Sequence, residues 1–106
     1  MDVVALLGEF PVGDPAGMRR AARRLHVQAE RIRTVGERAA QGADATAFEC
    51  AAADRFRSVV RDIRAGCIRD AERVHAAADY LSRAASRLEG RQAEWRRAAA
   101  RLQQEV

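Results

Sequence analysis

Apolar or small residues recur at alternating intervals of four and three through the second half of the chain, and this spacing constrains the fold more than any other feature. In an α-helix the repeat forms one narrow stripe, whereas a strand requires alternation at every second residue. Only Asp70 and Arg91 interrupt the stripe. Its members are Phe56, Val60, Ile63, Cys67, Asp70, Val74, Ala77, Leu81, Ala84, Leu88, Arg91, Trp95, Ala98 and Leu102. The sequence therefore predicts a helix that begins at residue 47 and ends at residue 89 or 104.

The two end points differ in whether Gly90, beside the off-pattern Arg91, breaks the helix. A break makes residues 91–104 a separate or kinked helix anchored by Trp95. Without a break, a helix of about 85 Å would extend far beyond its neighbour, and its distal half would dock on a second chain. Asp70 lies either at the edge of the stripe or against an arginine of a neighbouring helix.

A first helix is predicted over residues 15–41. Asp14 followed by Pro15 is typical of an N-cap and a first helical residue. The same four-three spacing then places one stripe on the helix, formed by Met18, Ala22, Leu25, Ala29, Ile32, Gly36 and Ala39.

The turn between the helices is predicted at residues 42–45. Gly42 suits a left-handed C-cap, and the segment from Thr46 to Glu49 has the pattern of a capping box, so the second helix should begin at Ala47. The expected fold is an all-α hairpin of two long antiparallel helices. Residues 1–13 form a short leader, and residues 14–106 form the single domain for which 106 residues leave room.

This hairpin has little bulk with which to build a core. Alanine supplies most of the 48% hydrophobic content, and aromatic residues make up only 5%. We therefore expect a partner to complete the core, with two hairpins forming a four-helix bundle. The expected partner-binding residues are Met18, Leu25, Ile32, Val60, Ile63, Val74, Leu81, Leu88 and Trp95, joined near the turn by Phe48 and Phe56.

Charge adds little to this picture. All 19 basic residues are arginines, and the net charge is +4, but acidic residues are interleaved with them along the same helices. Such a pattern is typical of a solvated face with pairs three and four residues apart. The densest basic cluster, residues 19–24, is the alternative site for nucleic acid, which is disfavoured because no helix-turn-helix spacing or interleaved aromatic residue accompanies it.

No pattern predicts catalysis, a cofactor or a metal. His26 and His75 stand on different helices without a carboxylate or cysteine placed to complete a ligand set, and both are expected at the surface. The serines lack a nucleophile elbow. Cys50 and Cys67 lie about 25 Å apart on one predicted helix, too far to bridge. Cys67 is expected to be a buried thiol, and Cys50 either tightly packed or paired with a second chain.

The amino-terminal segment has no basic region before its short apolar run, and no run of about 18 apolar residues exists. We therefore expect neither a cleavable signal peptide nor a membrane span. If the protein leaves the cell, it must use a route that reads no amino-terminal signal.

Residues 48–56, at the turn, resemble the motif of the small WXG proteins of type VII (ESX) secretion, which carry Trp-x-Gly at the turn and an aromatic residue eight positions after the tryptophan. Phe48 stands at the tryptophan position, Glu49 between, Cys50 at the glycine position and Phe56 at the later aromatic position. The resemblance extends over residues 13–90. It diverges again at Tyr80, because the family's Tyr-x-x-x-Asp/Glu export signal would need an acidic residue where Ala84 stands.

The resemblance implies a non-enzymatic bacterial protein that acts as a secreted dimer subunit or as a helical partner of a larger secreted effector. Implied partners are a second copy, a related helical protein or the helical domain of an effector, and a secretion ATPase. The implied location is cytoplasmic before export, then outside the cell or at its envelope. The alternative from a different class is a cytoplasmic coiled-coil scaffold or regulator unrelated to secretion.

Overall fold

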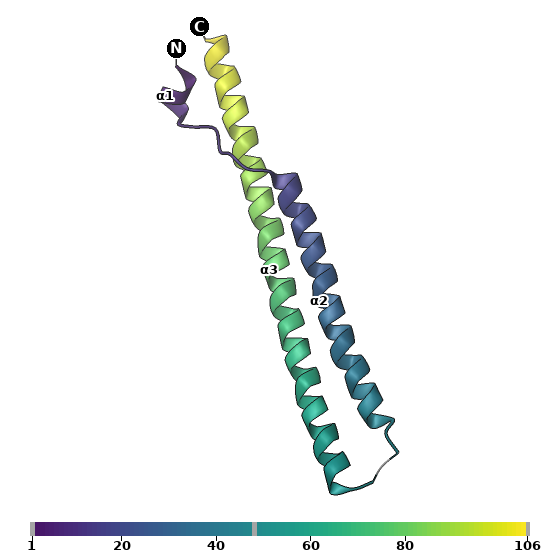
Figure 1. The fold of residues 1–106 in the computed structure, drawn as a ribbon. Helices are drawn as coiled ribbons and strands as arrows, with labels where there is room; N and C mark the ends of the chain where they lie inside the picture. Colours follow the sequence, from purple (N-terminus) through teal and green to yellow (C-terminus); the bar gives the residue numbers. More distant parts are fainter. Residues whose placement is uncertain (1, 48, 106) are drawn as a thin grey trace.

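The computed structural model describes residues 2–47 and 49–105, and within them the chain forms three helices. These are α1 (Val3–Leu7), α2 (Pro15–Asp44) and α3 (Ala51–Gln104). α2 and α3 lie antiparallel and side by side (Figure 1), and the molecule measures 84 × 16 × 12 Å along its principal axes. The predicted all-α hairpin of two long helices is confirmed, and the short α1 lies in the predicted leader.

α2 begins as predicted but ends at Asp44 rather than at residue 41. Pro15 occupies the first turn. Gly42 stays helical, so the predicted left-handed cap is wrong. The Ala45 amide donates to the Gln41 carbonyl at 3.0 Å, which continues the helical bonding past Gly42.

The predicted capping box is also wrong, because α3 begins at Ala51 and its N-cap is Cys50. The Cys50 thiol accepts a hydrogen bond from the Ala53 amide at 3.4 Å. The Thr46 hydroxyl lies before this start and donates to the carbonyl of Gly42 at 3.2 Å. Phe48 lies outside the described residues.

Arg57, near the start of α3, forms hydrogen bonds to the connection between the two long helices. Its guanidinium donates to the carbonyl oxygens of Thr46 at 2.7 Å and Ala43 at 3.4 Å, and to the Asp54 carboxylate at 3.1 Å. The last carbonyls of a helix have no partner within the helix. Arg57 therefore adds a charged donor to the Ala43 carbonyl at the end of α2, beside the Thr46 amide, and ties α3 to the connection through the Thr46 carbonyl.

α3 runs without a break through Gly90, so the predicted break is wrong. A Cβ added at Gly90 would meet nothing within 4 Å, which means that no neighbour requires glycine there. Glycine costs a helix only about 1 kcal/mol relative to alanine. Leu88 and Gln92 are buried on either side, and this packing keeps the helix continuous.

The predicted stripe on α3 consists of two alternating series of positions, each with a spacing of seven residues. The structure buries or half-buries one series as predicted, and it shifts the other series by one residue. Every seventh residue from Val60 to Leu102 is buried or half-buried, as predicted. From residue 70 onward the alternate positions are shifted by one, so Ala71 and Gln92 are buried where the stripe had Asp70 and Arg91. Both of those charged residues are exposed, and Asp70 pairs with Arg73 of its own helix at 3.7 Å.

On α2 the predicted stripe is buried or half-buried as far as Gly36, after which Ala40 is buried in place of Ala39. Gly36 marks a close approach of the two helices. A Cβ added there would lie 2.7 Å from Cβ and 3.1 Å from Sγ of Cys67, which is half-buried rather than buried. The helices could not pack at this distance with a larger residue at position 36.

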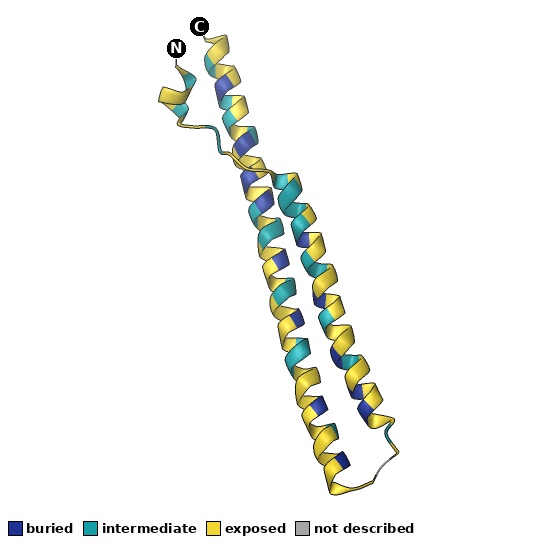
Figure 2. Cartoon of the chain, viewed as in Figure 1, coloured by how far each residue is buried: buried dark blue, intermediate teal, exposed yellow. Residues whose placement is uncertain are grey.

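The core is a line of small residues along the seam (Figure 2). Among the described residues, the buried apolar side chains are alanines except for Val60 and Leu88; the alanines are Ala22, Ala29, Ala40, Ala43, Ala53, Ala71, Ala78, Ala85 and Ala99. Each buried methyl group contributes little transfer free energy, about 0.8 kcal/mol per CH₂-sized group. The hairpin is therefore closely packed but has a thin core.

The amino-terminal leader covers part of α3 beyond the start of α2 (Figure 1). The Gln92 amide donates to the carbonyl oxygens of Pro11 at 2.9 Å and Gly13 at 3.1 Å. The Trp95 indole donates to the Gly8 carbonyl at 3.1 Å and meets the Phe10 ring edge to face, with centroids 5.4 Å apart. Part of the distal half of α3 is thus covered by the chain's own leader.

Candidate helix-docking surface

Most of the predicted partner-binding residues lie along the seam of the hairpin itself. Val60 and Leu88 are buried, and Ile63 is exposed. The others are half-buried, namely Met18, Leu25, Ile32, Val74, Leu81 and Trp95. The bulkier seam residues therefore pack within one chain, and among the predicted partner-binding residues that the structure describes only Phe56 and Ile63 are more than half exposed.

An exposed apolar stripe runs along the turn-proximal part of α3 beside the seam. It consists of Phe56, Val59 and Ile63, whose relative exposures are 54%, 55% and 52%. Their spacing of three and four residues places them on one face of the helix. Val59 is the member that the sequence analysis did not select, although its spacing from Phe56 and Ile63 could have identified it.

The motif residues at the turn are accessible where they are described. Glu49, Cys50 and Phe56 are exposed, and Cys50 is a free thiol held at the N-cap. Arg57 was missed by the sequence analysis, because nothing in the pattern distinguishes it from the many other arginines. Only the path of the turn brings the carbonyls of residues 43 and 46 within its reach.

Two arginines of the predicted nucleic-acid cluster have acidic partners. Arg19 forms a two-bonded pair with Glu89 of α3, at 2.7 and 3.2 Å, and Arg20 lies 3.6 Å from Asp14. The hydrogen bonds from Arg19, reinforced by its positive charge, lower the pKa of Glu89 below its usual value. The Arg19 to Glu89 pair also ties the start of α2 to α3.

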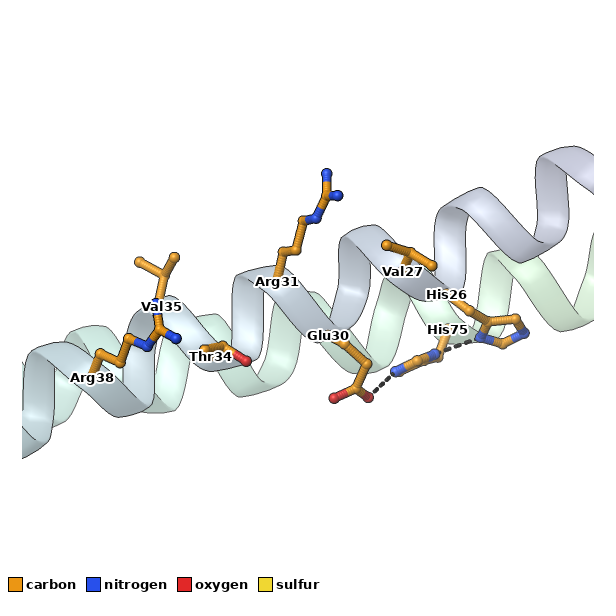
Figure 3. A pocket seen from close by; sticks show the side chains of 8 residues that line it. All are labelled: His26, Val27, Glu30, Arg31, Thr34, Val35, Arg38 and His75. Carbon is orange, nitrogen blue, oxygen red and sulfur yellow. Dashed lines mark hydrogen bonds and ion pairs between the residues drawn. The ribbon is translucent and has the colours of Figure 1, made fainter.

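His26 and His75 face each other across the seam, contrary to the expectation that both are isolated at the surface (Figure 3). Their Nδ1 atoms are 2.6 Å apart. The Nε2 atom of His75 lies 2.9 Å from Glu30 Oε1, and that of His26 lies 3.3 Å from Asp79 Oδ1. The structure therefore assembles two imidazoles and two carboxylates that the sequence separates by up to 53 positions.

Among the described residues, no group of three or more histidine, cysteine, aspartate or glutamate side chains is arranged to hold a metal ion. Within the same residues, no helix is both long enough and apolar enough to cross a bilayer.

Comparison with known proteins returns no similar protein: no family model matches this chain, and neither does any curated protein or solved structure.

Proposed function

We propose that this chain is a non-enzymatic helix-docking protein whose hairpin packs against a second helical hairpin to form a four-helix bundle. The exposed stripe of Phe56, Val59 and Ile63 is the observation that carries this proposal. Aromatic and branched aliphatic side chains on one helix face are the anchors that helix partners bury. Their burial between two chains would remove from water the largest apolar side chains exposed on α3 near the turn.

The thin core supports the same proposal. The seam is lined mainly by alanines, and an isolated two-helix layer of this kind buries little apolar surface per residue. A second hairpin that covers the Phe56 face would convert a two-helix layer into a bundle with larger side chains in its interior. The partner is either a second copy of this chain or a related helical protein.

Within this class we propose a WXG-like protein of type VII secretion. The support is the hairpin layout together with the order of residues at the turn, from Phe48 through Cys50 to Phe56. In this role the bundle is exported as a dimer, or holds a larger effector in a form that the secretion ATPase accepts. Because Tyr80 is not followed by an acidic residue at position 84, the export signal would be supplied by the partner.

The proposal is tested by light scattering over a concentration series, with and without reductant. We expect a dimer of about twice the 11.7 kDa chain mass, insensitive to reductant and dissociated by Phe56→Ser combined with Ile63→Ser. Val27→Ser is the matched control, since Val27 is 51% exposed on α2 at a position away from the seam. A compact monomer that binds none of the proteins encoded beside it would refute the proposal, and a dimer lost only on reduction would assign dimerisation to Cys50.

A coiled-coil scaffold unrelated to secretion is the second candidate, and the unbroken α3 favours it. A continuous helix of 54 residues makes the molecule a rod 84 Å long, which can separate or align partners bound at its two ends. A gene neighbourhood without a secretion ATPase or a toxin would favour the scaffold. Specific co-purification with a neighbouring secretion component would favour the first proposal.

A further inference from the structure

The acidic and basic residues of α2 alternate in the sequence but lie on different faces of the folded helix. α2 contains seven arginines and three acidic residues. The acidic residues stand seven positions apart on one face, and each has a partner, namely Glu30 with His75 at 2.9 Å, Glu37 with Arg33 at 3.3 Å and Asp44 with Arg61 at 3.6 Å. Two of these three pairs reach across to α3, so the acidic face of α2 borders that helix.

Three arginines on the outer side of α2 have no such partner. Arg24, Arg31 and Arg38 are exposed, and within residues 2–47 and 49–105 no acidic group pairs with them. They also stand seven positions apart, so they form a line along the helix with about 10.5 Å between successive Cα atoms. Figure 3 shows Arg31 pointing away from Glu30 and His75. This line of positive charge is therefore accessible to a ligand.

Two hollows on the same side join into one groove. Val27, Arg31, Val35 and Arg38 line the first hollow, and Arg20 lines the second together with Val27 and Arg31, so the last two residues line both. From residue 20 to residue 38 this outer groove spans about 27 Å. Val27 and Val35 are 51% and 65% exposed, on the side of α2 turned away from α3 (Figure 3). The outer groove is therefore both basic and aliphatic.

The rows of side chains along the outer groove suit a helix as its occupant. In the first hollow, the α2 residues form two rows with a spacing of four, namely residues 26, 30, 34 and 38 and residues 27, 31 and 35. The groove between two such rows receives a row with a spacing of three from a second helix that crosses at about 20°. The one carboxylate in this lining belongs to Glu30 and lies 2.9 Å from His75. A nearly parallel helix can thus lie there without meeting an unpaired carboxylate.

We propose that the outer groove of α2 binds an acidic amphipathic helix of another protein. Carboxylates at every seventh position of that helix would repeat at the same interval as Arg24, Arg31 and Arg38, which keeps opposite charges adjacent over three heptads. Its aliphatic side chains would cover Val27 and Val35, as an amphipathic helix does when it lies in an apolar groove.

A second copy of this chain does not offer that ligand. The acidic residues of α2 are paired already, and α3 has no three acidic residues at a spacing of seven. Two outer grooves placed together would also set arginine against arginine. The outer groove shares no residue with the exposed stripe of Phe56, Val59 and Ile63, so its occupant is a different partner from a second hairpin bound at that stripe.

Nucleic acid is the competing anionic ligand, and two observations disfavour it. The phosphates of a duplex wind around its axis, whereas Arg24, Arg31 and Arg38 follow a straight helix, so only part of the line could contact one backbone. The exposed valines between the arginines have no role in phosphate contacts, which come from charged and polar groups. Both observations fit a helix that presents carboxylates and aliphatic side chains on one face.

The test measures binding of full-length protein to a fluorescently labelled helical peptide by anisotropy at low salt. The peptide has three heptads, each with one glutamate and two leucines facing the same side, and a second peptide carries glutamine in place of glutamate. We expect saturable binding of the glutamate peptide and about tenfold weaker binding of the glutamine peptide. Combining Arg24→Gln, Arg31→Gln and Arg38→Gln should weaken binding of the glutamate peptide about tenfold, because exposed ion pairs are individually weak but three act together.

The matched control combines Arg69→Gln, Arg83→Gln and Arg97→Gln, which removes the same charge from exposed residues of α3. This variant should bind the glutamate peptide as the wild type does. Equal weakening in the two triple variants would mean that the peptide responds only to net charge, and it would overturn the proposal. Absence of saturable binding to the wild type would overturn it as well.

Val27→Ser combined with Val35→Ser distinguishes a helix from nucleic acid. It should weaken binding of the glutamate peptide several-fold and leave the affinity for a labelled DNA duplex unchanged. A duplex that binds the wild type more tightly than the peptide does at the same salt, and that is lost in the α2 triple variant, would assign the groove to nucleic acid. Phe56→Ser combined with Ile63→Ser should leave peptide binding unchanged, so this proposal and the four-helix bundle can fail separately.

Discussion

Gly36→Ala tests whether the two long helices are held at the separation that the seam requires. The new Cβ would lie 2.7 Å from Cβ of Cys67, 3.1 Å from its Sγ and 3.4 Å from Cα of Arg64. A separation of 2.7 Å is well below van der Waals contact, and neither a Cβ nor a helix backbone can move away without shifting the helix. The helices must therefore separate locally or strain.

The magnitude follows from two opposing effects. Alanine improves helix propensity over glycine by about 0.5–1 kcal/mol, which stabilises the folded state. Overpacking of a close interface costs about 1–3 kcal/mol. Gly90→Ala isolates the first effect, because Gly90 lies in α3 with nothing within 4 Å of its added Cβ. The free energy of unfolding should therefore be lower for Gly36→Ala than for Gly90→Ala by about 1–3 kcal/mol.

The assay is urea unfolding followed by circular dichroism at one fixed protein concentration, with wild type, both alanine variants and Cys67→Gly in the same series. Combining Gly36→Ala with Cys67→Gly removes the Cβ that the new methyl group would meet, so the double variant should be more stable than the sum of the single effects predicts. If Gly36→Ala stabilises the protein as much as Gly90→Ala does, the close approach at Gly36 is refuted.

Three further predictions follow from the same structure. Arg57→Ala should lower the free energy of unfolding by about 1.5–3 kcal/mol, because the carbonyls of Ala43 and Thr46 lose a charged donor; urea unfolding measures this, and an equal loss in the exposed neighbour Arg55→Ala would contradict it. Glu89→Gln should lower the melting temperature at pH 7. Arg19 depresses the pKa of Glu89, so this contribution is present above the ordinary carboxyl range of about 4.3 and is lost as the pH falls through the depressed pKa; a difference between the two proteins that stays constant down to pH 3 would refute the reasoning. Gly13→Ala should release the leader from α3, since Gly13 has a φ of +147° and its added Cβ would collide with Cδ2 of Leu88. The emission of Trp95, the only tryptophan, should then shift to the red, while Gly42→Ala, far away on α2, should leave it unchanged.

The sequence determined the helices and their approximate places. The four-three spacing required helical structure, and Asp14-Pro15 fixed the start of α2. One heptad position of the α3 stripe, the series that includes Val60 and Leu88, was also correct. These features are local: they depend on spacing along one helix and on residues within a few positions of each other.

The other half of the α3 stripe depended on the partner helix. Alanines occur at two neighbouring series of positions in α3, so spacing alone cannot decide which series faces α2. The predicted stripe followed the series that contains Asp70 and Arg91. In the structure Ala71 and Ala78 are buried, and Gly36 of α2 has no space for a Cβ where it meets Cys67, so the packing of the two helices decides which positions face inward. Register across a seam of small residues is thus a property of the pair of helices.

The contacts between distant parts of the chain came from the tertiary structure alone. The leader lies against α3 because Gln92 and Trp95 donate hydrogen bonds to backbone carbonyls more than 75 positions away. The meeting of His26 with His75 has the same origin. Spacing along a helix assigns a residue to a face, but only the antiparallel alignment of α2 with α3 decides which residue it meets there, and so which side chains form a hydrogen bond or an ion pair.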